Sequence, residues 1–184
     1  KDRAEHESDY RGMMHTVNLK PFTEEQLKLH TKGKVPVIGL VPGQITTRYL
    51  KEEVAAENGL FCPDSTYSKL CVFERHRGTG NIKAAPLKGY GITNGAVATS
   101  VAHDSHNIIA AGDNDRDIMK AVEMIQEMQG GYALVQDGKD VGRLPLPIAG
   151  LMSTQPAKEI QRRLDAMVQR AREKGVSDDC YPFT

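Results

Sequence analysis

Apolar and polar positions separate most sharply in the middle of the chain, over residues 95–112. Small apolar residues fill both ends of this stretch, which predicts two short buried strands. The five residues between them, His-Asp-Ser-His-Asn at 103–107, are all polar, and we call them the polar loop. Imidazole and carboxylate groups are costly to bury unless they are paired, hydrogen-bonded or metal-bound. The polar loop is therefore either a corner that satisfies its own hydrogen bonds or a chemical site.

The part of the chain before this stretch predicts strands and one short helix. Apolar residues at 13, 17 and 19 favour a short strand over residues 13–19. Thr23 and Gln26 fit a capping box that opens a short helix through about residue 29. The apolar run at 35–41 predicts a buried strand, with Pro36 at its start or at a sheet edge. We also expect a turn at 42–43, extended chain over 44–53, a loop over 55–68 and a strand at 69–74, whereas residues 83–91 show no clear pattern.

The part after it alternates helix and hairpin. Residues 113–115 are typical of a helix cap, and apolar residues then recur at helical spacing to about residue 129. A strand at 132–136, a turn at Asp137-Gly138 and a second strand at 141–146 predict a β-hairpin. A final amphipathic helix opens near Pro156 and ends at Gly175. The sum predicts an α/β (α+β) fold: a mixed β-sheet with helices packed on it.

Length and charge limit the possible roles. The 184 residues suffice for one sizeable domain or at most two small ones, and 24 basic residues balance 24 acidic ones. Zero net charge argues against nucleic acid or an anionic membrane as partner, and no apolar run is long enough to span a bilayer. Three cysteines without CxxC spacing predict free thiols in a reducing, cytoplasmic compartment. The charged start lacks a signal peptide and an initiator methionine, so we expect a fragment with a flexible segment at residues 1–14.

Two polar segments are candidates for chemistry. In the polar loop, His103, Asp104 and His106 suit a transition metal or proton transfer near neutral pH, although HxxH alone is weak metal spacing. In the second segment, Glu74 and His76 lie two apart at the end of a predicted strand and share one face. The glycine turn at 78–81 would offer backbone N–H groups to an anion. The alternatives are a polar corner in the first case and an ordinary charged strand end in the second.

Four sequence blocks resemble one known family. They are VPGQITT at 41–47, FERHRGTGN at 73–81, SVAHDSHNII at 100–109 and LPLPIAGLMS at 144–153. In this order they are similar to the C-terminal region of bacterial-type adenine deaminases, of the amidohydrolase superfamily. The resemblance implies that residues 15–184 are the accessory domain of a barrel enzyme.

The resemblance also implies an activity. The family hydrolyses adenine to hypoxanthine and ammonia with a hydroxide that a divalent metal activates, which is manganese, iron or zinc. The family's main metal ligands lie in an upstream barrel domain that begins with a His-x-His motif. This chain has no such motif, so we expect the fragment alone to be inactive. The resemblance also implies that the full enzyme is a homo-oligomer. Within this chain we expect supporting catalytic roles for His103, Asp104, His106 and Asn107, and substrate contacts from Glu74, His76 and Ser105.

Two other interpretations stay open. In the first, the chain is a purely structural domain that packs on the barrel or forms a subunit interface, with the apolar segment 144–152 as its contact. Alternatively, it is an independent module that binds a small molecule or a metal. The first alternative predicts that changes in the polar loop affect stability alone, and the second predicts that the isolated chain binds a ligand.

Overall fold

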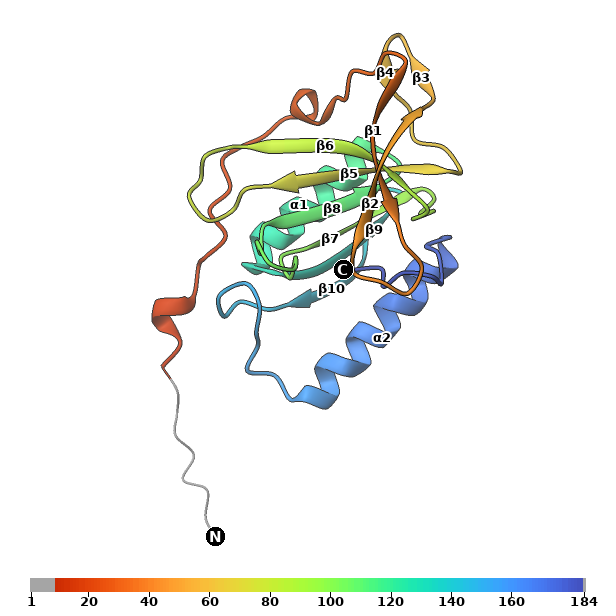
Figure 1. Ribbon diagram of the computed structural model, residues 1–184. Helices are drawn as coiled ribbons and strands as arrows, with labels where there is room; N and C mark the ends of the chain where they lie inside the picture. The colour runs from red at the N-terminus through yellow and green to blue at the C-terminus, as the bar shows by residue number, and fades with distance from the viewer. Residues whose placement is uncertain (1–8, 184) are drawn as a thin grey trace.

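The computed structural model describes residues 9–183, which form one eight-stranded mixed sheet with a helix on each face (Figure 1). The strand order is β10-β9-β7-β8-β5-β6-β1-β2. Among the neighbouring strands of this described sheet, β1 and β6 are the only parallel pair. This architecture confirms the predicted mixed sheet with packed helices. The strands of this sheet are β1 (Lys34–Leu40), β2 (Thr47–Glu53), β5 (Tyr67–Phe73), β6 (Ile82–Lys88), β7 (Gly95–Thr99), β8 (Ile108–Gly112), β9 (Gly131–Gln136) and β10 (Lys139–Pro145). The remaining elements are the short hairpin β3 (Ala56–Glu57) and β4 (Leu60–Phe61), the 3₁₀ turns η1 (Arg11–Met13) and η2 (Glu24–Leu27), and the helices α1 (Asp115–Met128) and α2 (Ala157–Glu173).

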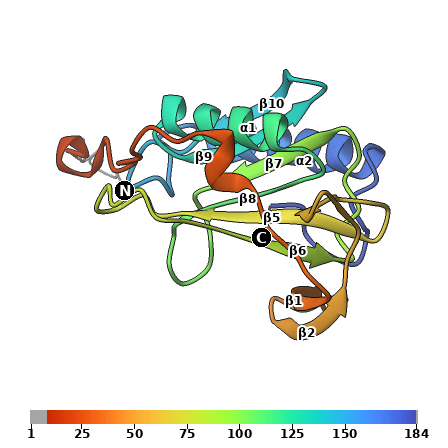
Figure 2. The same ribbon diagram turned by 90° about the horizontal axis from the view of Figure 1, so that it is seen from above.

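Helix α1 covers the centre of one sheet face, where β7 and β8 confirm the two predicted buried strands (Figure 2). Small residues on these strands let the helix approach closely. A Cβ at Gly112, for example, would lie 2.8 Å from the Cγ1 atom of Ile118 on α1. Asn114 caps the helix, as expected, because its side chain accepts the Asp117 amide at 2.8 Å. The centre of the fold is therefore a closely packed contact between α1 and the sheet.

Helix α2 packs on the opposite face, along the β10 edge of the sheet (Figure 1). Met167 and Ala171 are its fully buried residues, and they join Val97 and Leu134 of the sheet in a second core. Residues 176–183 form no helix or strand, yet they close this core. Phe183 is buried, and the Tyr90 hydroxyl donates to the Pro182 carbonyl at 2.6 Å.

The structure corrects several local predictions. Residues 13–19 form no strand, because the amides of Val17 and Asn18 bond to the Gln129 side chain and the Arg75 carbonyl. The loop predicted at 55–68 contains the β3–β4 hairpin, and Tyr67 already belongs to β5. Strand β1 is only partly buried, since it lies next to the edge strand β2. Strand β6 had no clear sequence pattern, and Pro86 lies within it.

Two expectations concern the ends and the surface of the chain. The flexible segment predicted at 1–14 stays a prediction: residues 1–8 lie outside the described range, and η1 occupies part of the rest. Across residues 9–183, neither helix is long and apolar enough to cross a membrane.

Candidate functional site

The two polar segments meet at one edge of the sheet. Strands β5 and β7 are both antiparallel to β8 and therefore run in the same direction, so the segments that follow them emerge side by side. The contact is direct: the His76 Nε2 atom lies 2.9 Å from the Ser105 carbonyl oxygen. Arg75 Nε donates to the His106 carbonyl at 2.5 Å. The segment after β5 therefore contacts the polar loop through Arg75 and His76.

Three of the four sequence blocks converge at this edge. The block at 73–81 follows β5, the block at 100–109 spans the polar loop, and residues 146–153 follow β10. Strand β10 ends here because it is antiparallel to β9, which is antiparallel to β7. The block at 41–47 lies elsewhere, in the β1–β2 turn, where Gly43 bonds to the C-terminal tail at the Asp179 carbonyl. The candidate site therefore comprises three loops that are distant in sequence.

The polar loop projects from the sheet into solvent, so most of its side chains are exposed. His103 and Asp104 keep 73% and 97% of their side-chain surface exposed, and their Nδ1 and Oδ1 atoms lie 3.0 Å apart. Ser105 is also exposed, whereas His106 and Asn107 are half-buried. The buried atoms His106 Nδ1 and Asn107 Oδ1 have no hydrogen-bond partner within the described chain.

The backbone of this loop is sharply bent. Asp104 and His106 have φ angles of 43° and 48°, in the left-handed region that costs a residue with a side chain about 1 kcal/mol. The His106 amide closes the turn by donating to the Ala102 carbonyl at 2.7 Å. Strained conformations of this kind persist only where surrounding contacts hold them.

Glu74 behaves differently from the polar loop. Its carboxylate accepts the amides of His76, Arg77 and Thr79 at 2.6, 2.7 and 3.0 Å, and the Thr79 hydroxyl at 2.9 Å. These donors lower the pKa of Glu74 to about 2, the Thr79 amide most of all. Within the glycine turn at 78–81, the Thr79 amide is thus occupied by Glu74, and the Asn81 amide donates to the Thr79 hydroxyl. A substrate contact from Glu74 stays a prediction, but both of its oxygens already serve the loop.

The residues between 9 and 183 do not offer a ligand set that fits a metal. Between residues 9 and 183, no three His, Cys, Asp or Glu side chains lie together in a group that could hold an ion. The pair of His103 and Asp104 is too small a ligand set for a structural or catalytic zinc site, which takes three or four protein ligands.

Arg75 is the residue that sequence reasoning missed. It is 1% exposed, although charged residues are rarely so deeply buried. Burial lowers the pKa of its guanidinium. The missed signal was strand alternation: Cys71, Phe73 and Arg75 are two apart, so all three point to the α1 face. Ser100 was also missed, and its buried hydroxyl donates to the Gly150 carbonyl at 2.6 Å and accepts the Gly131 amide at 2.8 Å.

Comparison with known proteins identifies the family. A family model described as the adenine deaminase C-terminal domain matches residues 44–184. "Adenine deaminase 2" of Carboxydothermus hydrogenoformans is 44% identical over 178 residues, which cover 95% of this chain and 31% of that protein. "Adenine deaminase" of Desulfitobacterium hafniense is 41% identical over 169 residues, 91% of this chain and 30% of that protein. The chain thus spans about a third of the length of these relatives, and it belongs to the adenine deaminase C-terminal domain family.

Proposed function

We propose that this chain serves as the C-terminal domain of an adenine deaminase, and that the full-length enzyme hydrolyses adenine to hypoxanthine and ammonia. Two observations support the proposal: the family match over residues 44–184, and relatives named adenine deaminase that are more than 40% identical over at least 91% of this chain. We assign the divalent metal, manganese, iron or zinc, to the upstream barrel that the resemblance to this family implies. The enzyme would act in the cytoplasm, as a homo-oligomer.

Within that enzyme, we assign to the polar loop the task of completing or supporting the active site. The observation that carries this proposal is the geometry of the loop, whose backbone is held by Arg75 and His76 while His103, Asp104 and Ser105 point into solvent. An imidazole paired with a carboxylate can hold or pass a proton near neutral pH. His106 and Asn107 would support the loop from behind, where their buried Nδ1 and Oδ1 atoms have no partner among residues 9–183.

The test is alanine substitution in the full-length enzyme. His103→Ala and His106→Ala are each expected to lower kcat/KM for adenine at least tenfold while the fold stays intact, because general acid–base groups contribute on the order of 10²–10⁴ in rate. His30→Ala is the matched control, since His30 lies beside β4 in a backbone bridge with Leu60. If both loop variants keep full turnover and a native circular dichroism spectrum, the loop has no part in the chemistry.

A second experiment assigns the metal centre. The purified 184-residue chain is incubated with adenine and manganese or iron, and hypoxanthine formation is followed against a metal-only control. We expect no turnover, because the chemistry belongs to the barrel. Turnover above the control would mean that the polar loop is itself a complete active site.

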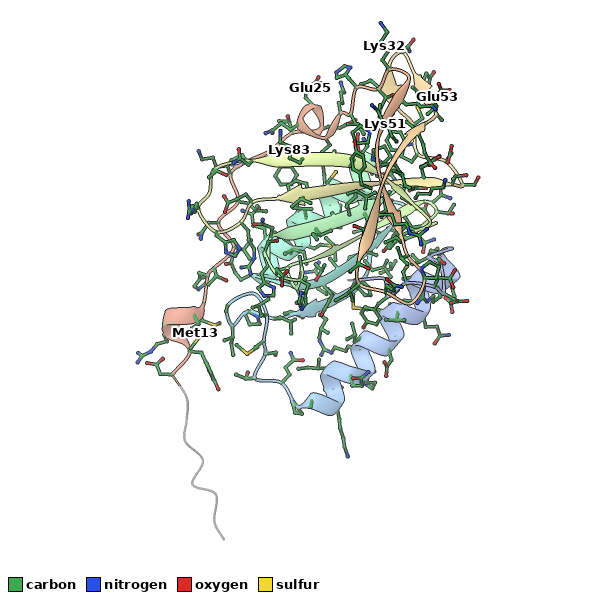
Figure 3. All side chains as sticks on the ribbon, viewed as in Figure 1. Met13, Glu25, Lys32, Lys51, Glu53 and Lys83 are labelled. Atoms are coloured by element: carbon green, nitrogen blue, oxygen red, sulfur yellow. The ribbon has the colours of Figure 1, made fainter. Side chains whose placement is uncertain are left out.

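A subunit or domain interface is the second candidate function. Met13 and Met152 are 46% and 52% exposed, and they belong to adjoining segments, since the Ala149 amide donates to the Met13 carbonyl. Figure 3 shows Met13 on the turn that leads away from the sheet. A hollow lined by residues that include Met14, Pro147 and Ile148 borders this surface. Met152→Lys in the full-length enzyme, followed by sedimentation, would shift the oligomeric state if this surface joins subunits.

A further inference from the structure

The Arg75 guanidinium joins three segments that are far apart in sequence. Its Nε donates to the His106 carbonyl at 2.5 Å, and its Nη2 donates to the Ala149 carbonyl at 3.2 Å. Its Nη1 donates to both the carbonyl and the hydroxyl of Thr16, each at 3.2 Å. One side chain therefore links the polar loop, the segment after β10 and the N-terminal segment.

All four acceptors are neutral. Among residues 9–183, Arg75 forms no ion pair, so the buried charge is satisfied by backbone carbonyls and one hydroxyl. A buried arginine is usually neutralised by a carboxylate. Where neutral oxygens replace the carboxylate, several of them must point at the same guanidinium. The three segments must therefore keep one mutual arrangement for the charge to be tolerated.

Two of these segments carry strained backbone where they meet the guanidinium. His106 and Ala149, whose carbonyls accept from Arg75, have φ angles of 48° and 56°. Gly150 follows with φ +72°, and a Cβ there would lie 2.7 Å from Arg75 Nη1. The chain at 149–150 is thus shaped around the guanidinium, and the planar fork of arginine suits such a site better than the point charge of lysine.

We propose that Arg75 is a positioning residue that fixes the polar loop in a single conformation, so that His103, Asp104 and His106 are presented in one geometry. The effect on turnover rests on the function proposed above, whereas the effect on loop order does not. His76 assists from the same strand end through its contact with the Ser105 carbonyl.

The test compares Arg75→Lys with Arg77→Lys in the full-length enzyme. Arg77 is an exposed neighbour whose side chain makes no hydrogen bond within the described residues, so its replacement controls for the loss of a guanidinium. Hydrogen–deuterium exchange is measured by mass spectrometry on peptides that cover residues 100–108. We expect exchange in Arg75→Lys to be at least tenfold faster there and unchanged over α1. On the folded variant, kcat for adenine should fall at least tenfold, a change that a residue without a link to the site would not cause.

Each outcome is decisive. Faster loop exchange with reduced kcat supports the proposal, and faster exchange with unchanged kinetics keeps Arg75 as a positioning residue but removes the loop from the active site. If Arg75→Lys does not fold, Thr16→Val replaces it, because that change removes one acceptor of Nη1 and keeps the arginine. Unchanged exchange over residues 100–108 in the folded variant, whichever is used, would overturn the proposal.

Discussion

Ser100→Ala is the substitution for which the structure makes the sharpest stability prediction. The Ser100 hydroxyl is fully buried at the end of β7, where it donates to the Gly150 carbonyl and accepts the Gly131 amide. Alanine removes one oxygen atom and both hydrogen bonds. Gly131 and Gly150 are themselves buried, so water cannot readily replace the hydroxyl.

The size of the effect follows from the two groups left behind. A buried backbone donor or acceptor without a partner costs about 1–3 kcal/mol. Two such groups, with partial relaxation around them, should lower the free energy of unfolding by about 2–4 kcal/mol. Since small domains are stable by roughly 5–15 kcal/mol, the variant should still fold at room temperature.

Ser68→Ala is the matched control. Ser68 is 1% exposed, but its hydroxyl has no hydrogen-bond partner in the described chain, so its removal deletes a buried unsatisfied group. Urea titration of the 184-residue chain, followed by circular dichroism, should show a midpoint lower by about 1–2 M for Ser100→Ala, given an m value of about 2 kcal/mol per M. Ser68→Ala should leave the midpoint unchanged or raise it. Equal losses for the two variants would refute the reasoning from hydrogen-bond satisfaction.

Three further predictions use the same chain. The pKa of Glu74 is lowered from 4.5 to about 2, so its contribution to stability is complete above about pH 4.5 and is lost as the pH falls towards 2. Glu74→Gln should therefore reduce the loss of unfolding free energy between pH 4.5 and pH 2. An unchanged loss over this pH range would contradict the prediction. Asn114→Ala removes the cap of α1 and should lower the free energy of unfolding by about 1 kcal/mol in the urea titration, with no change as the contrary result. Burial raises the pKa of the Cys71 thiol to about 12. Iodoacetamide at pH 8, followed by mass spectrometry, should therefore modify the half-buried Cys62 well before Cys71. Early labelling of Cys71 would show instead that β5 opens.

Sequence patterns predicted those elements that are determined by their own side chains. The small apolar residues of β7 and β8, the Asn114 cap and the Asp137-Gly138 turn all act locally, and each is found where it was expected. Residues 13–19 were misassigned because their amides bond to Gln129 and Arg75, partners that are distant in sequence. The pairing of β1 with β6 likewise depends on the whole sheet, and no pattern in the sequence of β6 predicts it.

The same distinction applies to the candidate site. Its polar residues were visible as a motif, and the direction of β5 and β7 explains why the motifs meet. The network that holds them was not visible, because Arg75 contacts carbonyl oxygens, and a carbonyl oxygen belongs to every residue. Only the alternation of β5 indicated that Arg75 points inward.

The two neighbouring loops satisfy their backbone polar groups in different ways. In the loop after β5, the Glu74 side chain turns inward and satisfies the backbone amides, which is how a self-contained polar corner behaves. In the polar loop, the only local cap is the Ser105 hydroxyl, 3.3 Å from the Asn107 amide, and the backbone is held from outside by Arg75 and His76. The corner interpretation therefore describes the loop of Glu74, and the site interpretation is the one to test at residues 103–107.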